Sequence, residues 1–416
     1  MEFPYTIVHL PARAKAPTPV KKGSKHPINE GLTDLLVGLE RSTHPLVNLK
    51  EPASPLRLER AMLRRAEAGD ERRDPDKLIM PVMPLILVGP DPTASDEALV
   101  DGADDAVPWG LRAVGADGSR FDGAGVRVAV LDSGLDLAHA AFVALNDEAR
   151  IITRNFTTGA PDDVHDATGH GTHCAGTICG GTVDGVRIGV APGLERLIVG
   201  KVLGPGSSTD VLAKALQWAV AEMKADIVSM SLGLDFPGQI QSLIARDIPL
   251  AQATSMALED YSDVLDTFRE LVDWLTCWNA LIVAATGNES RRPSYTINTA
   301  PPAAVASIVA VAALERHPSG LYVAPFSNTR PTVAAPGVNV RSARAGGGLV
   351  AKNGTSMAAP YVAGVAALWC QHLRQEQGEL TRDAVRSKLV GAATLNGLHV
   401  DSRQSRDVGN GLVRAP

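Results

Sequence analysis

An aspartate, a histidine and a serine, three residue types that can work together as a catalytic unit, occur in this chain within short motifs in a fixed order. The motifs are VAVLDSG at 128–134, GHGTHCAG at 169–176 and NGTSMAAP at 353–360. They supply Asp132, His170 and Ser356. A serine hydroxyl becomes a nucleophile when a base takes its proton, and a carboxylate orients that base. The three residues therefore predict acyl transfer by Ser356, with His170 as the base and Asp132 as its partner.

The elements that must position these residues are indicated by apolar runs without polar alternation, which are typical of strands buried on both faces. The runs lie at 126–131, 196–203, 226–232, 281–286 and 307–314. Helical patterns at 209–224 and 358–369 alternate with them, which favours right-handed crossovers between parallel strands. We therefore predict an α/β fold of three layers, a parallel central sheet flanked by helices, with Asp132 and Asn288 at the carboxyl ends of strands.

Composition and charge narrow the class of protein. The chain has 416 residues, enough for one large α/β domain and a smaller N-terminal region. The net charge of −6 is not typical of a protein that binds nucleic acid. No stretch of about 18 apolar residues predicts a membrane span, and the first residues lack the apolar core of a signal peptide. The four cysteines are scattered and read as free thiols. We therefore expect cytoplasmic residence, with neither nucleic acid nor membrane as a partner.

The order Asp, His, Ser and the residues around each motif resemble the subtilase family of serine proteases. The resemblance covers residues 106–416, from VPWGLRAVGA at 107–116 to DVGNGLVRAP at 407–416. The HGTHCAG motif is similar to that of proteinase K and its relatives. Membership would imply a subtilisin-like fold and a serine endopeptidase that hydrolyses peptide bonds through an acyl-enzyme, with protein or peptide substrates and no organic cofactor.

The same resemblance implies roles for further residues. Asn288, in AATGNES at 284–290, matches the asparagine of the oxyanion hole, and the backbone N–H of Ser356 at a helix start would complete that hole. The run Ser231, Leu232 and Gly233 resembles the extended edge that pairs with the substrate backbone. Asp166 resembles an acidic residue beside the substrate cleft, and a solvated loop carboxylate is an equal interpretation.

Other functions remain open beside hydrolysis. One is an inactive scaffold that binds peptides through the same cleft, and another is a peptide ligase or cyclase in which an amine replaces water in deacylation. Metal binding is a third reading, because ligand-like side chains cluster in the sequence at His165, Asp166, His170, His173 and Cys174. Their spacing fits no zinc pattern, so we predict no metal centre. The run His139-Ala140-Ala141 and the short loop at 180–189 also argue against calcium at the site used by the family.

Two segments lie outside the family pattern. Residues 1–105 contain a predicted helix at 55–68, and the acidic stretch 81–105 reads as an exposed linker. We expect this region to be a pro-region that inhibits the enzyme intramolecularly, or else a retained regulatory module. The insertion 234–279 contains helical patterns at 238–246 and 256–275. It is expected near the cleft, where it restricts access, binds a partner or only decorates the surface.

Overall fold

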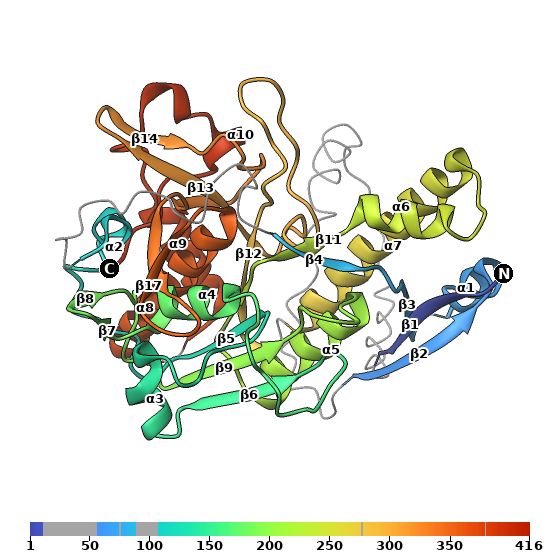
Figure 1. The fold of residues 1–416 in the computed structure, drawn as a ribbon, viewed down its shortest axis with the longest axis horizontal. Helices are drawn as coiled ribbons and strands as arrows, with labels where there is room; N and C mark the ends of the chain where they lie inside the picture. The colour runs from blue at the N-terminus through green and yellow to red at the C-terminus, as the bar shows by residue number, and fades with distance from the viewer. Residues whose placement is uncertain (11–55, 75, 89–106, 276–277, 379) are drawn as a thin grey trace, which may run out of the picture.

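The structure is a computed structural model that describes the whole chain except residues 11–55, 75, 89–106, 276–277 and 379 (Figure 1). Its largest sheet has eight strands in the order β14-β13-β12-β10-β5-β9-β6, with β15 paired to β13. The strands are β5 (Arg127–Asp132), β6 (Ile151–Asn155), β9 (Arg196–Lys201), β10 (Ile227–Met230), β12 (Leu281–Ala285), β13 (Val309–His317), β14 (Gly320–Val323) and β15 (Val333–Pro336). All pairings in this sheet are parallel except that of β13 with β14.

Helices cover both faces of this sheet. The helices of the large domain and its insertion are α2 (Trp109–Val114), α3 (Val143–Asp147), α4 (His170–Cys179), α5 (Thr209–Gln217), α6 (Phe236–Ile244), α7 (Leu250–Leu275), α8 (Thr355–Gln377), α9 (Arg382–Ala392) and α10 (Ser405–Val408). Alternate residues of β5 belong to different cores. Val128 and Val130 pack with α2, α4, α8 and α9, whereas Ala129 and Leu131 pack with α5 and α7. The strands are therefore buried on both faces, and the predicted three-layer α/β fold is confirmed.

The predicted elements of this domain agree with the structure apart from two details. The run 226–232 divides into β10 and a separate short strand, β11 (Leu232–Leu234), which leaves the main sheet. The helix predicted at 209–224 ends as α5 at Gln217 and continues as a π-helical turn over Trp218–Glu222. Two small hairpins complete the domain. They are β7 (Thr182–Val183) with β8 (Val186–Arg187), and β16 (Val340–Ala343) with β17 (Leu349–Lys352).

In its described residues, the N-terminal unit is a three-stranded antiparallel sheet with one helix. Its order is β2-β1-β3, built from β1 (Phe3–His9), β2 (Arg57–Leu63) and β3 (Lys77–Pro81), and α1 spans Arg65–Glu71. The helix predicted at 55–68 is therefore wrong over 57–63. The sequence RLERAML has good intrinsic helix formers, but pairing along the whole of β1, from Phe3 with Leu63 to His9 with Arg57, makes this segment a strand.

After β3 the chain leaves the N-terminal unit and crosses to the large domain as β4 (Leu85–Leu87). There β4 pairs antiparallel with β11, beside which it lies in Figure 1. Pro81, Met83, Leu85 and Val88 are buried. The prediction of an exposed linker is therefore wrong for residues 81–88, because their apolar side chains face the large domain. Residues 89–105 of the predicted linker lie outside the described residues.

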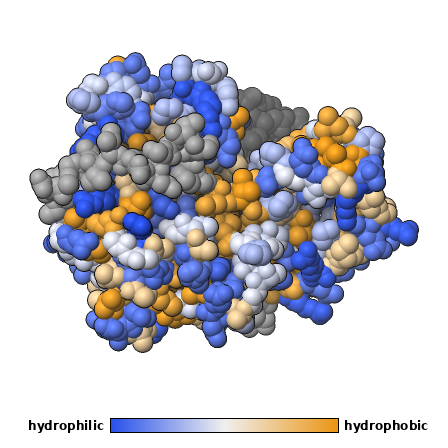
Figure 2. Space-filling model, viewed as in Figure 1, coloured by the Kyte–Doolittle hydropathy of each residue, from blue (hydrophilic) through white to orange (hydrophobic). Residues whose placement is uncertain are grey.

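The insertion forms the two predicted helices, α6 and α7, joined by a short turn. In Figure 1, α7 runs between the main sheet and the N-terminal unit, where it contacts β3. Figure 2 shows apolar residues on the surface at the end of the molecule formed by α6 and the start of α7, where Leu250 is exposed. No helix of the described residues is long and apolar enough to cross a membrane.

Candidate active site

Asp132 and His170 are brought together by the end of a strand and the start of a helix. Asp132 is the last residue of β5, His170 is the first residue of α4, and the two are almost completely buried. The Asp132 Oδ1 atom lies 2.8 Å from His170 Nδ1. The helix can approach this closely because residue 171 is glycine: a Cβ atom there would lie 2.3 Å from the Gly134 carbonyl oxygen.

This contact sets the protonation state of the histidine. Burial alone would lower the pKa of His170, but the adjacent Asp132 carboxylate and Cys174 together outweigh burial and raise the pKa well above its ordinary value. Because the carboxylate accepts a hydrogen bond at Nδ1, the neutral imidazole carries its proton there and presents Nε2 as a base. That Nε2 atom is buried and has no hydrogen-bond partner.

Asp166 holds the start of α4 in place. Its carboxylate accepts hydrogen bonds from the Thr172 backbone N–H at 2.8 Å, the Thr172 hydroxyl at 2.7 Å and the Ser133 hydroxyl at 2.8 Å. Burial favours the neutral acid, but these hydrogen bonds outweigh it and lower the pKa of Asp166. Asp166 is not a solvated carboxylate, because its side chain is buried and accepts hydrogen bonds from the first turn of the helix that carries His170. Its predicted place beside the substrate cleft stays a prediction.

Ser356 lies in the first turn of α8, as predicted, behind Gly354, whose φ of 150° favours glycine. Its carbonyl oxygen accepts hydrogen bonds from the Ser231 hydroxyl at 3.2 Å and the Cys174 thiol at 3.4 Å. The Cys174 sulfur also lies 3.8 Å from His170 Nδ1. Cys174 therefore touches both the histidine and the serine, which places Asp132, His170 and Ser356 in one buried cluster.

Asn288 is fixed beside this cluster with a defined orientation. The backbone N–H and the hydroxyl of Thr355 lie 2.9 Å from Asn288 Oδ1. A backbone N–H can only donate, so the side-chain atom that faces it is the oxygen. This leaves the Nδ2 amino group as the donor that Asn288 offers on its other side. The residue before Ser356 thus orients the amide.

The predicted edge Ser231, Leu232 and Gly233 is extended, and its occupant is a segment of the same chain. Leu232 pairs with Leu87 and Gly233 with Ile86, and the Val88 N–H donates to the Ser231 carbonyl at 3.3 Å. At the end of this ladder, the Ser356 hydroxyl donates a hydrogen bond to the Val88 carbonyl oxygen at 2.6 Å. Sequence reasoning did not find Val88, because nothing in the run LILVGP distinguishes a bound strand from a linker.

The possible metal ligands of the sequence do not gather at one place. His173 points away from the cluster: its Nε2 lies 2.9 Å from the Val340 carbonyl oxygen, and burial lowers the pKa of His173 to about 3. Among the residues that the structure describes, one group of three potential ligands converges, namely Asp132, His170 and Cys174. Burial raises the pKa of the Cys174 thiol, which disfavours the thiolate that binds metals. The group coincides with the predicted catalytic residues.

Comparison with known proteins identifies the family. A model of the subtilase family matches residues 123–411. The alkaline elastase YaB of Bacillus sp. (strain YaB) is 33% identical, with 74% of this chain and 69% of that protein aligned. Subtilisin Savinase of Lederbergia lenta is 31% identical over 74% of this chain and 97% of that protein. An intracellular serine protease of Paenibacillus polymyxa is 33% identical over 63% of this chain and 72% of that protein. The fold, the match over most of the large domain and these relatives together place the chain in the subtilase family of serine endopeptidases.

Proposed function

We propose that Asp132, His170 and Ser356 are the catalytic triad, that Asn288 and the backbone N–H of Ser356 form the oxyanion hole, and that residues 231–233 bind the substrate backbone. The observation that carries this proposal is the strand β4 on β11, whose last carbonyl oxygen meets the Ser356 hydroxyl. A peptide bound in this way adds a strand to an open edge. Its backbone makes most of the contacts, which suits protein or peptide substrates of varied sequence.

In the proposed reaction, the Ser356 oxygen attacks the carbonyl carbon of the scissile bond while His170 Nε2 takes the hydroxyl proton. Asp132 stabilises the resulting imidazolium through the 2.8 Å contact at Nδ1. The negative charge on the carbonyl oxygen is met by the Ser356 N–H and the Asn288 amino group. His170 then gives its proton to the leaving amine. Water, activated by the same histidine, releases the acyl group and restores the serine.

We further propose that residues 1–88 inhibit the enzyme intramolecularly, as a zymogen would, and that the bond between Val88 and Gly89 is the one that the enzyme cuts in itself. Support comes from the position of the Val88 carbonyl at Ser356 and from the burial of the segment that precedes it. This moves the proposed boundary between the N-terminal unit and the peptidase domain from residue 105 to residue 88. While β4 is bound, no other peptide can occupy β11.

Cytoplasmic residence is also proposed, on two observations. Cys174, Cys179 and Cys370 are buried free thiols in the part of the chain that the structure describes, as is usual in a reducing compartment. In addition, the similar Paenibacillus polymyxa protein is named as an intracellular serine protease.

The triad is tested with a fluorophosphonate, which attaches covalently to an activated serine. Wild-type protein that has lost residues 1–88 should gain one adduct by intact mass, and the adduct should map to Ser356. Ser356→Ala should gain none, and Ser319→Ala, which changes an exposed serine outside the site, should label like wild type. Labelling of Ser356→Ala to the same extent would refute the assignment of the nucleophile.

A further inference from the structure

The insertion holds the N-terminal unit through a cluster of ion pairs. Three carboxylates of α7, Glu259, Asp260 and Asp263, form an acidic face that meets Arg65 and Arg72 of the N-terminal unit. Arg65 lies 2.6 Å from Asp260 and 2.8 Å from Glu259. Arg72 contacts Asp263 and lies 3.9 Å from Glu259. Two arginines and three acids thus join segments separated by about 190 positions in the sequence.

These charged side chains are partly buried, so the loss of a partner would be costly. The Asp260 side chain is only 3% exposed, and those of Arg65 and Arg72 are 21% and 27% exposed. Burial raises the pKa of Asp263 to about 6 even though Arg72 opposes the shift. A partly buried carboxylate that loses its arginine is left with an uncompensated cost. Asp260 also accepts from Gln239 of α6 at 2.8 Å, so both helices of the insertion take part.

An aromatic contact adds to the ion pairs. The Phe3 ring of β1 lies between two guanidinium groups, with Arg65 5.5 Å and Arg246 4.9 Å from its centroid. Arg246 follows α6, so this contact also crosses from the N-terminal unit to the insertion. Phe3 packs as well against the small apolar cluster of the insertion, which contains Leu243, Ile248, Ala253 and Ala257.

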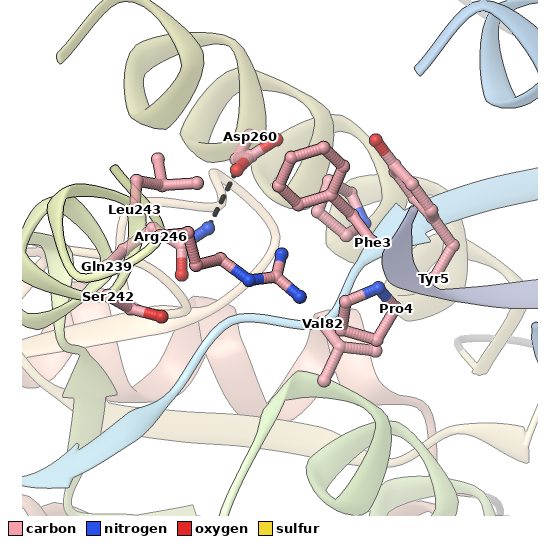
Figure 3. A pocket seen from close by; sticks show the side chains of 10 residues that line it. Phe3, Pro4, Tyr5, Val82, Gln239, Ser242, Leu243, Arg246 and Asp260 are labelled. Atoms are coloured by element: carbon pink, nitrogen blue, oxygen red, sulfur yellow. Dashed lines mark hydrogen bonds between the residues drawn. The ribbon is translucent and has the colours of Figure 1, made fainter. Parts of the chain in front are cut away.

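A pocket with polar and apolar lining lies in this interface. Figure 3 shows the pocket between the N-terminal unit and the insertion, lined by Phe3, Tyr5 and Val82 on one side and by Ser242 and Leu243 on the other. Its volume is about 170 Å³. The dashed line there marks the hydrogen bond of Gln239 with Asp260. The pocket is also lined by Arg246 and Asp260, so charged groups of the insertion face the N-terminal unit beside the ion pairs.

We propose that the insertion 234–279 is an ionic latch: its acidic face retains residues 1–88 against the peptidase domain, and raised ionic strength releases them. This inference rests on the proposed intramolecular inhibition and assigns a role to the insertion, whose part in the molecule the sequence left open. The cluster sits at the rim of the interface, with Glu259 half exposed. At about 1 M salt the screening length falls to about 3 Å, which weakens the half-exposed pair of Arg65 with Glu259 most, because more deeply buried pairs such as Arg65 with Asp260 are screened less.

One arm of the test does not depend on self-cleavage. Hydrogen exchange is measured on full-length Ser356→Ala, and its amides in β1 and α7 should exchange faster as salt rises from about 0.02 M to about 1 M. Adding Arg65→Ala and Arg72→Ala should raise exchange at low salt at least tenfold, as expected when both cations are removed. Glu259→Gln with Asp263→Asn, which leaves the N-terminal unit unaltered, should do the same. Exchange that neither salt nor either double variant changes would overturn the latch.

The second arm uses wild type that has cut itself. The fragment of residues 1–88 should co-elute with the rest of the protein at low salt and separate at high salt. Arg73→Ala is the matched control, because Arg73 is 83% exposed and pairs with Asp70 of its own unit; its fragment should be retained as in wild type. The charge exchange Arg72→Glu with Asp263→Arg should restore retention lost in either single variant. If wild type makes no cut, that result counts against the proposed function. The hydrogen-exchange measurement on Ser356→Ala would still test the ionic latch, because it does not need a cut.

Discussion

Ser356 donates its hydroxyl proton to the Val88 carbonyl oxygen, 2.6 Å away, while the Nε2 atom of His170 has no hydrogen-bond partner. A serine hydroxyl has one proton and cannot donate it to both groups. In this state the Ser356 hydroxyl donates its hydrogen bond to the bound strand and not to His170 Nε2, the hydrogen bond that would activate the serine. The strand β4 therefore occupies the edge β11, and the proposed cut after Val88 requires the Ser356 hydroxyl to turn from the Val88 oxygen to His170 Nε2.

The burial of Val88 predicts where a charge in β4 is tolerated. Val88→Asp should slow self-cleavage by at least about 100-fold, because an unpaired carboxylate would enter an apolar position that is 4% exposed. Ile86→Asp, in the same strand at a position that is 36% exposed, should change the rate only a few-fold. The rates are measured by intact mass over time. Equal effects of the two substitutions would show that the burial of Val88 does not control the cut.

Asn288 should act on the transition state and not on substrate binding. Asn288→Leu removes the amide donor, and kcat on a peptide substrate should fall about 100- to 1,000-fold with little change in KM. Thr355→Ala, which removes the hydroxyl that helps to orient the amide, should cause a smaller fall in kcat. Steady-state kinetics of the two variants check this. An increase in KM with unchanged kcat would mean that Asn288 only binds substrate.

The pH dependence of activity should follow the raised pKa of His170. Catalysis needs the neutral imidazole, so the acid limb of kcat/KM should have its midpoint above about 6.5, the ordinary histidine value. Asp132→Asn removes the carboxylate, the strongest of the groups that oppose burial, which should move the midpoint to lower pH. The same variant should lower kcat by roughly 10⁴-fold. A wild-type midpoint below that of the variant would contradict the proposed role of Asp132.

His173 should make the fold sensitive to acid. Its pKa is lowered to about 3 by burial, whereas the unfolded chain binds a proton near pH 6.5. The contribution to stability is therefore complete above pH 6.5 and is lost as pH falls toward 3, at about 1.4 kcal/mol per pH unit. In the Ser356→Ala background, His173→Gln should flatten the dependence of the unfolding free energy on pH over this range. Urea titrations at pH 7 and 4.5 give the unfolding free energy of each protein. An equal loss of unfolding free energy with and without His173 would show that His173 does not cause the acid sensitivity.

Much of the site follows from sequence because its motifs combine a catalytic residue with the local structure that it needs. Asp132 follows an apolar run that becomes β5, and small residues around His170 and Ser356 allow α4 and α8 to approach each other. These are local signals, and the predicted positions of Asp132 at a strand end and of Ser356 at a helix start are confirmed. The helices of the insertion were likewise marked by their periodicity.

The parts that were predicted wrongly depend on contacts between distant segments. Residues 57–63 favour a helix locally and become β2 only because β1 pairs with them. The strand β4 is defined by β11, about 150 residues further along the chain. The five charges that join α1 to α7 also carry no pattern that links them in the sequence. Such pairings appear only once the chain is folded.

The measurement that tests the central claim most directly is the mass of the purified full-length chain and of Ser356→Ala after identical incubation. The account predicts that wild type gives two products, residues 1–88 and residues 89–416, while Ser356→Ala stays intact at 416 residues. A cut between Val88 and Gly89 in both proteins would show that another protease makes it. An intact wild type that also fails to react with a fluorophosphonate at high salt would contradict the assignment of Ser356 as the nucleophile.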